Sequence, residues 1–307
     1  MGISGHVTIF AGRYVEDFNK VSGISDPINV AYRLRVAYED EHTFSGKFES
    51  LLQDPKAADL EGLVIGAWTG DMHDYDSARV VRDLANAKDR LPNLKALFIG
   101  DIMSEESEIS WIEQSDMTPV LDAYPELEAF QVRGGNGLRF SSLQHEKLKE
   151  LVVQTGGLSP KTIAQICAAH LPNLEHLELW LGSQYYGGDA TVEDVAPIIS
   201  GKLFPKLTYL ALADSEIADD IAKALVNAPI MKQIERLDMS MGTMGDEGAE
   251  ALFDALVGSS VKRLNVSNNY LSKKAVQRLF KLPIKLRARN QDHDYGTPED
   301  RYVSVAE

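Results

Sequence analysis

Residues 237–272 read LDMSMGTMGDEGAEALFDALVGSSVKRLNVSNNYLS, and this stretch holds one complete copy of the unit that decides the fold. At its start, apolar and polar residues alternate, which is typical of a β-strand with one buried side. Apolar residues then recur at helical spacing until Gly258: Ala249, Leu252, Phe253 and Leu256. A second strand-like run, VKRLNV, follows from Val261. The stretch therefore predicts a strand, a turn, a helix and a return to a neighbouring strand.

The same short pattern, apolar–x–x–apolar–x–apolar, recurs along most of the chain. It begins at nine positions that are 21–34 residues apart: Ala31, Leu60, Leu94, Leu127, Leu148, Leu174, Leu207, Ile234 and Val261. Such intervals leave room for the long crossovers that parallel strands require. Stacked units bury apolar faces that a single unit leaves exposed, and such crossovers are right-handed. The sequence therefore predicts an α/β fold, a right-handed horseshoe solenoid of about nine repeats with parallel strands inside and helices outside.

The ends and one interval depart from the repeat. The interval from Leu127 to Leu148 contains GGNGLRFSSLQHEK, which is too short and Gly-rich for a full helix, so we expect an irregular segment there. Residues 1–30 contain the strand-like HVTIF and are expected to cap the first repeat. The predicted organisation is therefore an N-terminal cap over 1–30, a solenoid over 31–290 and a polar C-terminal tail over 291–307.

Composition narrows the classes of partner. Lys and Arg number 31 and Asp and Glu number 46, so the formal net charge is −15, which argues against a nucleic-acid binder. No apolar run approaches the roughly 20 residues that cross a bilayer, and the first residues do not resemble a secretory signal. Cys167 is the single cysteine, which excludes an intrachain disulfide and fits a reducing compartment. We therefore expect a cytoplasmic protein that acts without membrane or nucleic acid.

No motif predicts catalysis. Residues 70–76, GDMHDYD, could offer a hard cation Asp71, His73, Asp74 and Asp76, but the spacing matches no EF-hand, and Asp76 fits a helix cap. RGGNG over 133–137 lacks the spacing of a phosphate-binding loop and indicates a turn. Cys167 lies on an apolar helical stripe, which favours a packed thiol over a nucleophile. We therefore expect no catalytic residue, no cofactor and no metal.

The strand register predicts a binding surface instead. Phe98, Val152 and Trp180 are conspicuous on the side of the strands that should face solvent, because interface centres favour aromatic and apolar anchors. An equal alternative is that Trp180 folds over a neighbouring strand and packs internally. Acidic residues would flank the anchors and favour a protein or peptide of basic character. The predicted site consists of Phe98, Gln131, Arg133, Val152, Glu178, Trp180, Tyr185, Tyr186, Asp214 and Asp238.

Residues 237–272 also resemble the ribonuclease-inhibitor-like class of leucine-rich repeats, whose consensus LxxLxLxxNxL is often followed by a GDEGA-type helix start. The resemblance extends over about residues 31–286, and bacterial cytoplasmic members are the most similar group. It implies a non-catalytic protein–protein interaction module, such as a scaffold, adaptor or inhibitor that binds on the concave strand face. The alternative is a hydrolase with carboxylates on loops at the strand ends. The family's turn asparagine has a counterpart only at Asn269, so the other turns must satisfy their backbone groups differently.

Overall fold

The computed structural model describes residues 3–37, 40, 42–70, 75–293, 297 and 300–307. They form two compact units. The N-terminal unit contains the described residues up to 153 together with 169–171, and the C-terminal unit contains 154–168 and the described residues of 172–306. Each unit alternates strands with helices, as the repeat predicts.

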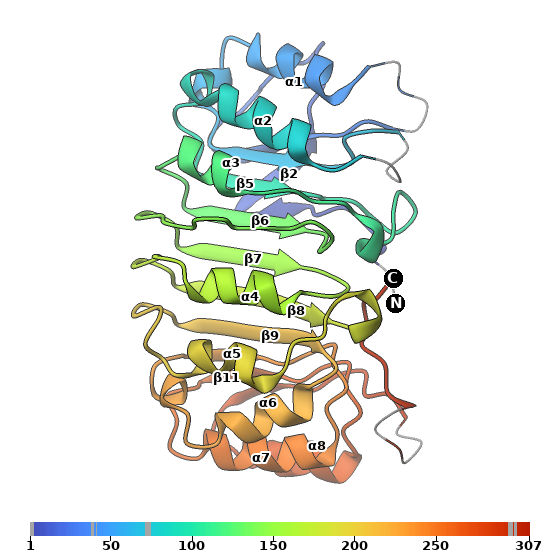
Figure 1. Cartoon of the computed structure of the whole chain (residues 1–307), viewed down its shortest axis with the longest axis vertical. Coiled ribbons are helices and arrows are strands. Elements are labelled where there is room, and N and C mark those ends of the chain that lie inside the picture. The colour runs from blue at the N-terminus through green and yellow to red at the C-terminus, as the bar shows by residue number, and fades with distance from the viewer. Residues whose placement is uncertain (1–2, 38–39, 41, 71–74, 294–296, 298–299) are drawn as a thin grey trace. The chain divides into compact units, whose positions relative to one another are not determined.

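The N-terminal unit follows chain order from strand to strand. An antiparallel hairpin, β1–β2, precedes parallel strands, and the helices lie on one side of these strands (Figure 1). The strands are β1 (Ile9–Phe10), β2 (Arg13–Asp17), β3 (Val30–Leu34), β4 (Gly62–Ile65), β5 (Ala96–Ile99), β6 (Ala129–Arg133) and β7 (Glu150–Gln154), the last residue of which is grouped with the C-terminal unit. The helices are α1 (Phe44–Leu52), α2 (Ala78–Asn86) and α3 (Thr118–Ala123), with 3₁₀ turns at 57–59, 88–90 and 109–111.

The C-terminal unit repeats the scheme with parallel strands only. Its strands are β8 (His176–Gly182), β9 (Tyr209–Ser215), β10 (Arg236–Asp238), β11 (Arg263–Asn265) and β12 (Lys285–Arg287). Its helices are α4 (Pro160–Cys167), α5 (Val192–Ile199), α6 (Ala218–Leu225), α7 (Asp246–Leu256) and α8 (Lys273–Leu279), with 3₁₀ turns at 184–186 and 229–232.

The repeat leucines form the core in register. Leu177 on β8 pairs with Leu210 on β9, which pairs with Leu237 on β10 and onward with Leu264 on β11. Each is at most 2% exposed, and full burial of one leucine contributes roughly 1.5–3 kcal/mol. This ladder of buried leucines holds the parallel strands together and confirms the predicted α/β solenoid.

Local signals in the sequence also set the helix boundaries. The Ser159 hydroxyl accepts a hydrogen bond from the Thr162 amide at the start of α4, and Ser272 does the same for Ala275 at the start of α8. Asn269, which is fully buried, accepts from the Met244 amide and donates to the Met239 carbonyl. The serine contacts fix where α4 and α8 begin, and Asn269 has the turn role that the family resemblance implies.

Other turns satisfy their backbone by different means, as expected. The Thr243 hydroxyl lies within hydrogen-bonding distance of the Ser215 and Glu216 carbonyls, and the Gln114 side chain donates to the Arg133 carbonyl at 2.7 Å. The connection over 134–149 holds neither helix nor strand, which confirms the predicted irregular segment. Within the described ranges, three strands lie outside the nine of the repeat: β1, which falls in the strand-like HVTIF, and β2 and β12.

Candidate functional site

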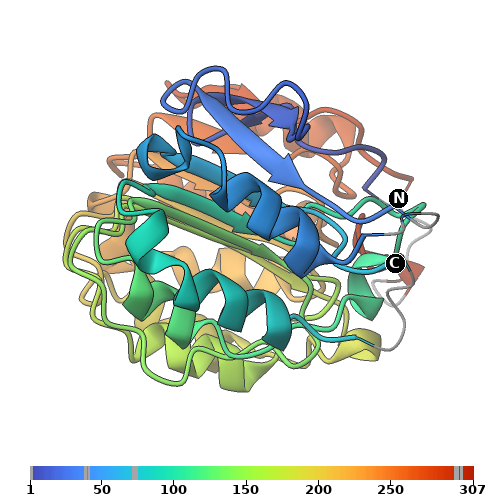
Figure 2. The same ribbon diagram turned by 90° about the horizontal axis from the view of Figure 1, so that it is seen from above.

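The strand face of the N-terminal unit is covered by the chain's own beginning. Figure 2 shows the dark-blue N-terminal segment on the opposite side of β3 from α1. The Phe10 ring packs on the Phe98 ring at 5.8 Å, within a cluster that also contains Val64, and Val7, Ala11 and Val15 pack against it. Phe98 is completely buried as a result. The expectation that Phe98 faces solvent was therefore wrong.

Three more residues of the predicted site are buried in this part of the chain. Gln131 is 9% exposed, Arg133 3% and Val152 4%. Arg133 lies over the Phe98 ring at 5.2 Å and donates to the Ile102 carbonyl at 2.8 Å. Its desolvation lowers the pKa of the guanidinium to about 10. These side chains belong to the interior of the structure, so their expected exposure was also wrong.

A buried charge cluster lies at the end of β5, where the hydrolase alternative expects carboxylates. Asp101 is fully buried and pairs with Arg33 at 3.0 Å and with His6 at 3.4 Å. Burial opposes its ionisation, but the His6 hydrogen bond and the Arg133 charge lower the pKa of Asp101 below its usual value. His6 Nε2 lies 3.5 Å from Glu106, and its bonds to the Asp101 and Glu106 carboxylates raise the pKa of His6 to about 9. The cluster holds the N-terminal segment in place.

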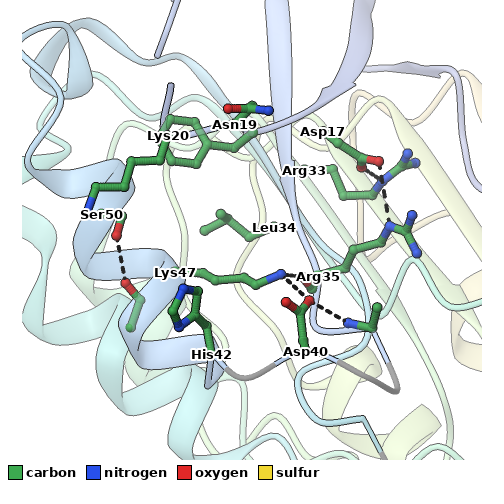
Figure 3. Close-up of a pocket in the computed structure, with 13 residues that line it drawn as sticks. Asp17, Asn19, Lys20, Arg33, Leu34, Arg35, Asp40, His42, Lys47 and Ser50 are labelled. Carbon is green, nitrogen blue, oxygen red and sulfur yellow. Dashed lines mark hydrogen bonds and ion pairs between the residues drawn. The ribbon is translucent and has the colours of Figure 1, made fainter. Parts of the chain in front are cut away.

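A hollow of about 480 Å³ opens beside α1 in the N-terminal unit (Figure 3). Its basic side chains are largely balanced by carboxylates. Arg33 and Arg35 both approach Asp17, at 2.6 and 3.6 Å, and Lys47 pairs with Asp40 and donates to the Arg35 carbonyl. An anion that entered this hollow would have to compete with these internal pairs.

The strand face of the C-terminal unit, by contrast, is open. Along β8, alternate residues are buried and half-buried, and on β10 and β11 the residue before each core leucine is exposed. On β9 the face is closed except at half-buried Tyr209, because Ala211 and Ala213 are buried. We call this surface, formed by the side chains of β8–β12 that point away from the leucine ladder, the open strand face. It is the surface on which a partner can reach strand side chains.

Three predicted residues meet on the open strand face around Tyr209. The Trp180 indole donates to Glu178 at 2.8 Å, and the Tyr209 hydroxyl lies 3.4 Å from Glu178 and 3.5 Å from Asp238. Burial and these two carboxylates raise the pKa of Tyr209 above its usual value. Trp180 is half-buried and its indole nitrogen is hydrogen-bonded. Its position therefore lies between the two alternatives given above, an exposed anchor and an internally packed side chain.

The remaining predicted residues lie in the turn after β8 and at the end of β9. Tyr185 and Tyr186 occupy the 3₁₀ turn after β8, and Tyr185 is 79% exposed. Asp214 is fully buried and accepts a hydrogen bond from the Val305 amide at 2.9 Å, which fastens the C-terminal tail. Burial raises the pKa of Asp214 well above its usual value. The expected exposure of Asp214 was wrong, because the tail covers it.

Four exposed cations of the open strand face did not enter the predicted site: Arg236, Arg263, Lys285 and Arg287. The signal was available, because the residue before the central leucine of each strand lies on the same side as the residue after it. Tyr209, which ties Glu178 to Asp238, occupies the same position on β9.

The cation-loop residues Asp71, His73 and Asp74 lie outside the described residues. The Asp76 carboxylate accepts from the Ala78 amide at the start of α2, as expected of a cap. Among the described residues, no group of three or more His, Cys, Asp or Glu side chains could hold a metal ion. Burial raises the pKa of the Cys167 thiol to about 11, which leaves it a poor nucleophile. No helix within the described ranges is long and apolar enough to span a bilayer.

Comparison with known proteins agrees with the repeat. The family model described as "Leucine Rich repeat" matches residues 205–226 and 234–253. The crystal structure of a Bacteroides fragilis protein, a structural-genomics target, superposes with a TM-score of 0.83. It is 30% identical, and the match covers 91% of this chain and 79% of that one. No curated protein matches the chain. With the buried leucine ladder and its parallel strands, these matches show that the chain belongs to the leucine-rich-repeat proteins.

Proposed function

We propose that this protein is a non-catalytic interaction module that binds a protein partner on the open strand face of its C-terminal unit. Leucine-rich-repeat domains generally bind proteins. The observation that carries the proposal is the difference between the two strand faces. Phe10 and its neighbours cover the N-terminal one, whereas β8, β10, β11 and β12 present half-buried or exposed side chains, and β9 presents half-buried Tyr209. Stacked parallel strands form extended surfaces suited to macromolecules.

Trp180 and Tyr209 are the anchors we propose for this contact. Aromatic side chains supply large apolar areas, and hot spots of interfaces are enriched in tryptophan and tyrosine. Glu178 holds the Trp180 indole, and Tyr209 lies between Glu178 and Asp238, so the pair is ordered before a partner arrives. Tyr185 and Tyr186 extend the contact beyond β8 in this proposal.

A scaffold, adaptor or inhibitor role in the cytoplasm fits this proposal, as does membership of the ribonuclease-inhibitor-like class. We also propose that the chain is organised as an N-terminal cap over 1–30, a solenoid over 31–290 and a C-terminal tail over 291–307. The hydrolase alternative gains no support. The carboxylates after β5 and at the end of β9, Asp101 and Asp214, are fully buried and bonded to Arg33 and to the Val305 amide.

Affinity capture tests the proposal. The full chain, Trp180→Ala and Phe280→Ala would be used to capture partners from the native cell, with identification by mass spectrometry. Phe280 is a matched control, because it is an aromatic residue that is 61% exposed at the end of α8, away from the strands. We expect a partner that the wild-type chain and Phe280→Ala retain and Trp180→Ala loses. Equal retention by all three proteins would remove the open strand face from consideration.

A further inference from the structure

The end of the open strand face carries four cations that form no ion pair with a described carboxylate, although the charges of Arg236 and Arg263 help to lower the pKa of nearby Glu235. Arg236, Arg263 and Lys285 stand in register on β10, β11 and β12, and Arg287 stands one row further along β12. All four are exposed, and none forms an ion pair or a side-chain hydrogen bond with any described residue. We call these four residues the basic face.

Three other cations of the same unit are paired with carboxylates. Lys262 pairs with Glu235 at 2.5 Å, Arg278 with Glu250 at 2.6 Å, and Lys223 with Glu247 at 3.2 Å. In a chain with 46 acidic and 31 basic residues, the basic face is distinguished by three cations that stand directly beside one another on adjacent strands. Like charges directly opposite each other on adjacent strands are destabilising, so folding alone does not favour this arrangement.

Protection of an exposed sheet edge explains the charge of only two of the four residues of the basic face. Lysine and arginine on an edge strand discourage pairing with other chains, and this accounts for Lys285 and Arg287 on β12, which pairs only with β11 among the described strands. Arg236 and Arg263 stand on β10 and β11, each of which is paired on both sides. Their charge requires another explanation.

Asp238 is the one carboxylate among the described residues that line the hollow beside the basic face, and it is already engaged. The Asp238 carboxylate accepts hydrogen bonds from the side-chain amide of Asn265 at 2.8 Å and from the Ser240 hydroxyl at 2.6 Å. The basic face and Asp238 line a shared hollow of about 440 Å³. Four cations and one anion leave a formal charge of +3 around this hollow, in a chain whose net charge is −15.

We propose that the basic face is the docking site for an acidic segment of the partner protein, whose aspartate and glutamate carboxylates pair with Arg236, Arg263, Lys285 and Arg287. This rests on the proposed function, because it assigns chemistry to the partner of the same open strand face. It replaces the basic partner expected from the sequence: Asp214 is buried, and Glu178 and Asp238 are already hydrogen-bonded. A short acidic peptide can pair with the basic face without approaching the acidic rest of the protein surface. A long nucleic acid would extend beyond the basic face and be repelled by that acidic surface.

Binding of a labelled acidic peptide tests this assignment. The probe is a fluorescein-tagged octapeptide of alternating aspartate and glutamate, measured by anisotropy at low salt with the full chain. The test variant is Arg236→Gln/Arg263→Gln/Lys285→Gln. The matched control, Lys273→Gln/Lys274→Gln/Lys281→Gln, removes the same charge from exposed positions on or next to α8. We expect the test variant to bind roughly tenfold more weakly, because each exposed ion pair contributes a few-fold in affinity.

Three outcomes overturn the assignment: no binding by the wild-type chain at low salt, equal loss in the control variant, or tighter binding of an octathymidylate than of the peptide. The third outcome would assign the basic face to nucleic acid. Thermal unfolding of both variants shows whether they are folded, and relief of stacked like charges should leave the test variant at least as stable as the wild type. If partner capture depends on Trp180 but the peptide does not bind, the interaction module stands and only the acidic chemistry fails.

Discussion

The N-terminal segment should be fastened by a protonated histidine. The pKa of His6 rises from 6.5 to about 9, because it lies against the Asp101 and Glu106 carboxylates and its side chain is only 13% exposed. Arg33, Arg35 and Arg133 approach the same carboxylates and limit the effect. A pKa difference of this size corresponds to at most about 3 kcal/mol, at about 1.4 kcal/mol per pH unit. Because the folded-state pKa is raised, the contribution is complete below pH 6.5 and disappears as the pH rises to about 9.

Hydrogen exchange measures this effect at the segment itself. The Val15 amide donates to the Thr8 carbonyl, so its protection reports on the hairpin. We expect His6→Gln to reduce that protection by up to about 100-fold at pH 6, the equivalent of about 3 kcal/mol, and to have little effect near pH 9. His170→Gln is the control, because that side chain is 64% exposed in the same unit. A ratio between wild type and His6→Gln that stays constant with pH would refute the reasoning.

Three further perturbations have defined outcomes. Phe10→Ala should weaken the hairpin's packing on Phe98 by about 3–5 kcal/mol and increase the fluorescence of a hydrophobic dye that binds the uncovered face. Ile9→Ala is the control because Ile9 is exposed, and equal dye fluorescence in the two variants would contradict the prediction. Asn269→Ala should lower the free energy of unfolding by about 3 kcal/mol or more in urea, because the Met244 amide and buried carbonyls lose their partner; a loss below about 1 kcal/mol would contradict this role. Asp214→Asn should gain stability over the wild type as the pH rises through the raised pKa of Asp214, since asparagine cannot ionise and tolerates the backbone φ of 50°; a variant less stable than wild type at pH 8 would disprove it.

The fold was predictable because its determinants are local and repeated. Leu177, Leu210 and Leu237 stand at equivalent positions of the pattern, and this spacing predicts which side of each strand is buried. Ser159 bonds a residue in the same helical turn, and Asn269 bonds residues no more than one repeat away. Their roles could therefore also be inferred from neighbouring residues.

The site was harder to predict because it depends on what covers each face. Phe98 is buried by Phe10, a residue 88 positions earlier in the chain, and Asp214 by a tail that begins more than 75 positions later. Strand alternation predicts which way these side chains point, but not whether another segment lies over them. Lys285 and Arg287 were missed for a different reason, since the strand IKLRAR does not preserve the full apolar pattern.

The closed N-terminal strand face limits how long a recognised motif can be. With that face covered by the hairpin, the contact proposed above has β8–β12 available to it, and five adjacent strands about 4.8 Å apart span roughly 19 Å. An extended chain advances about 3.3 Å per residue, so one that crosses these strands has room for about six residues. In the proposed contact, this length favours a short linear motif of the partner over a long extended segment.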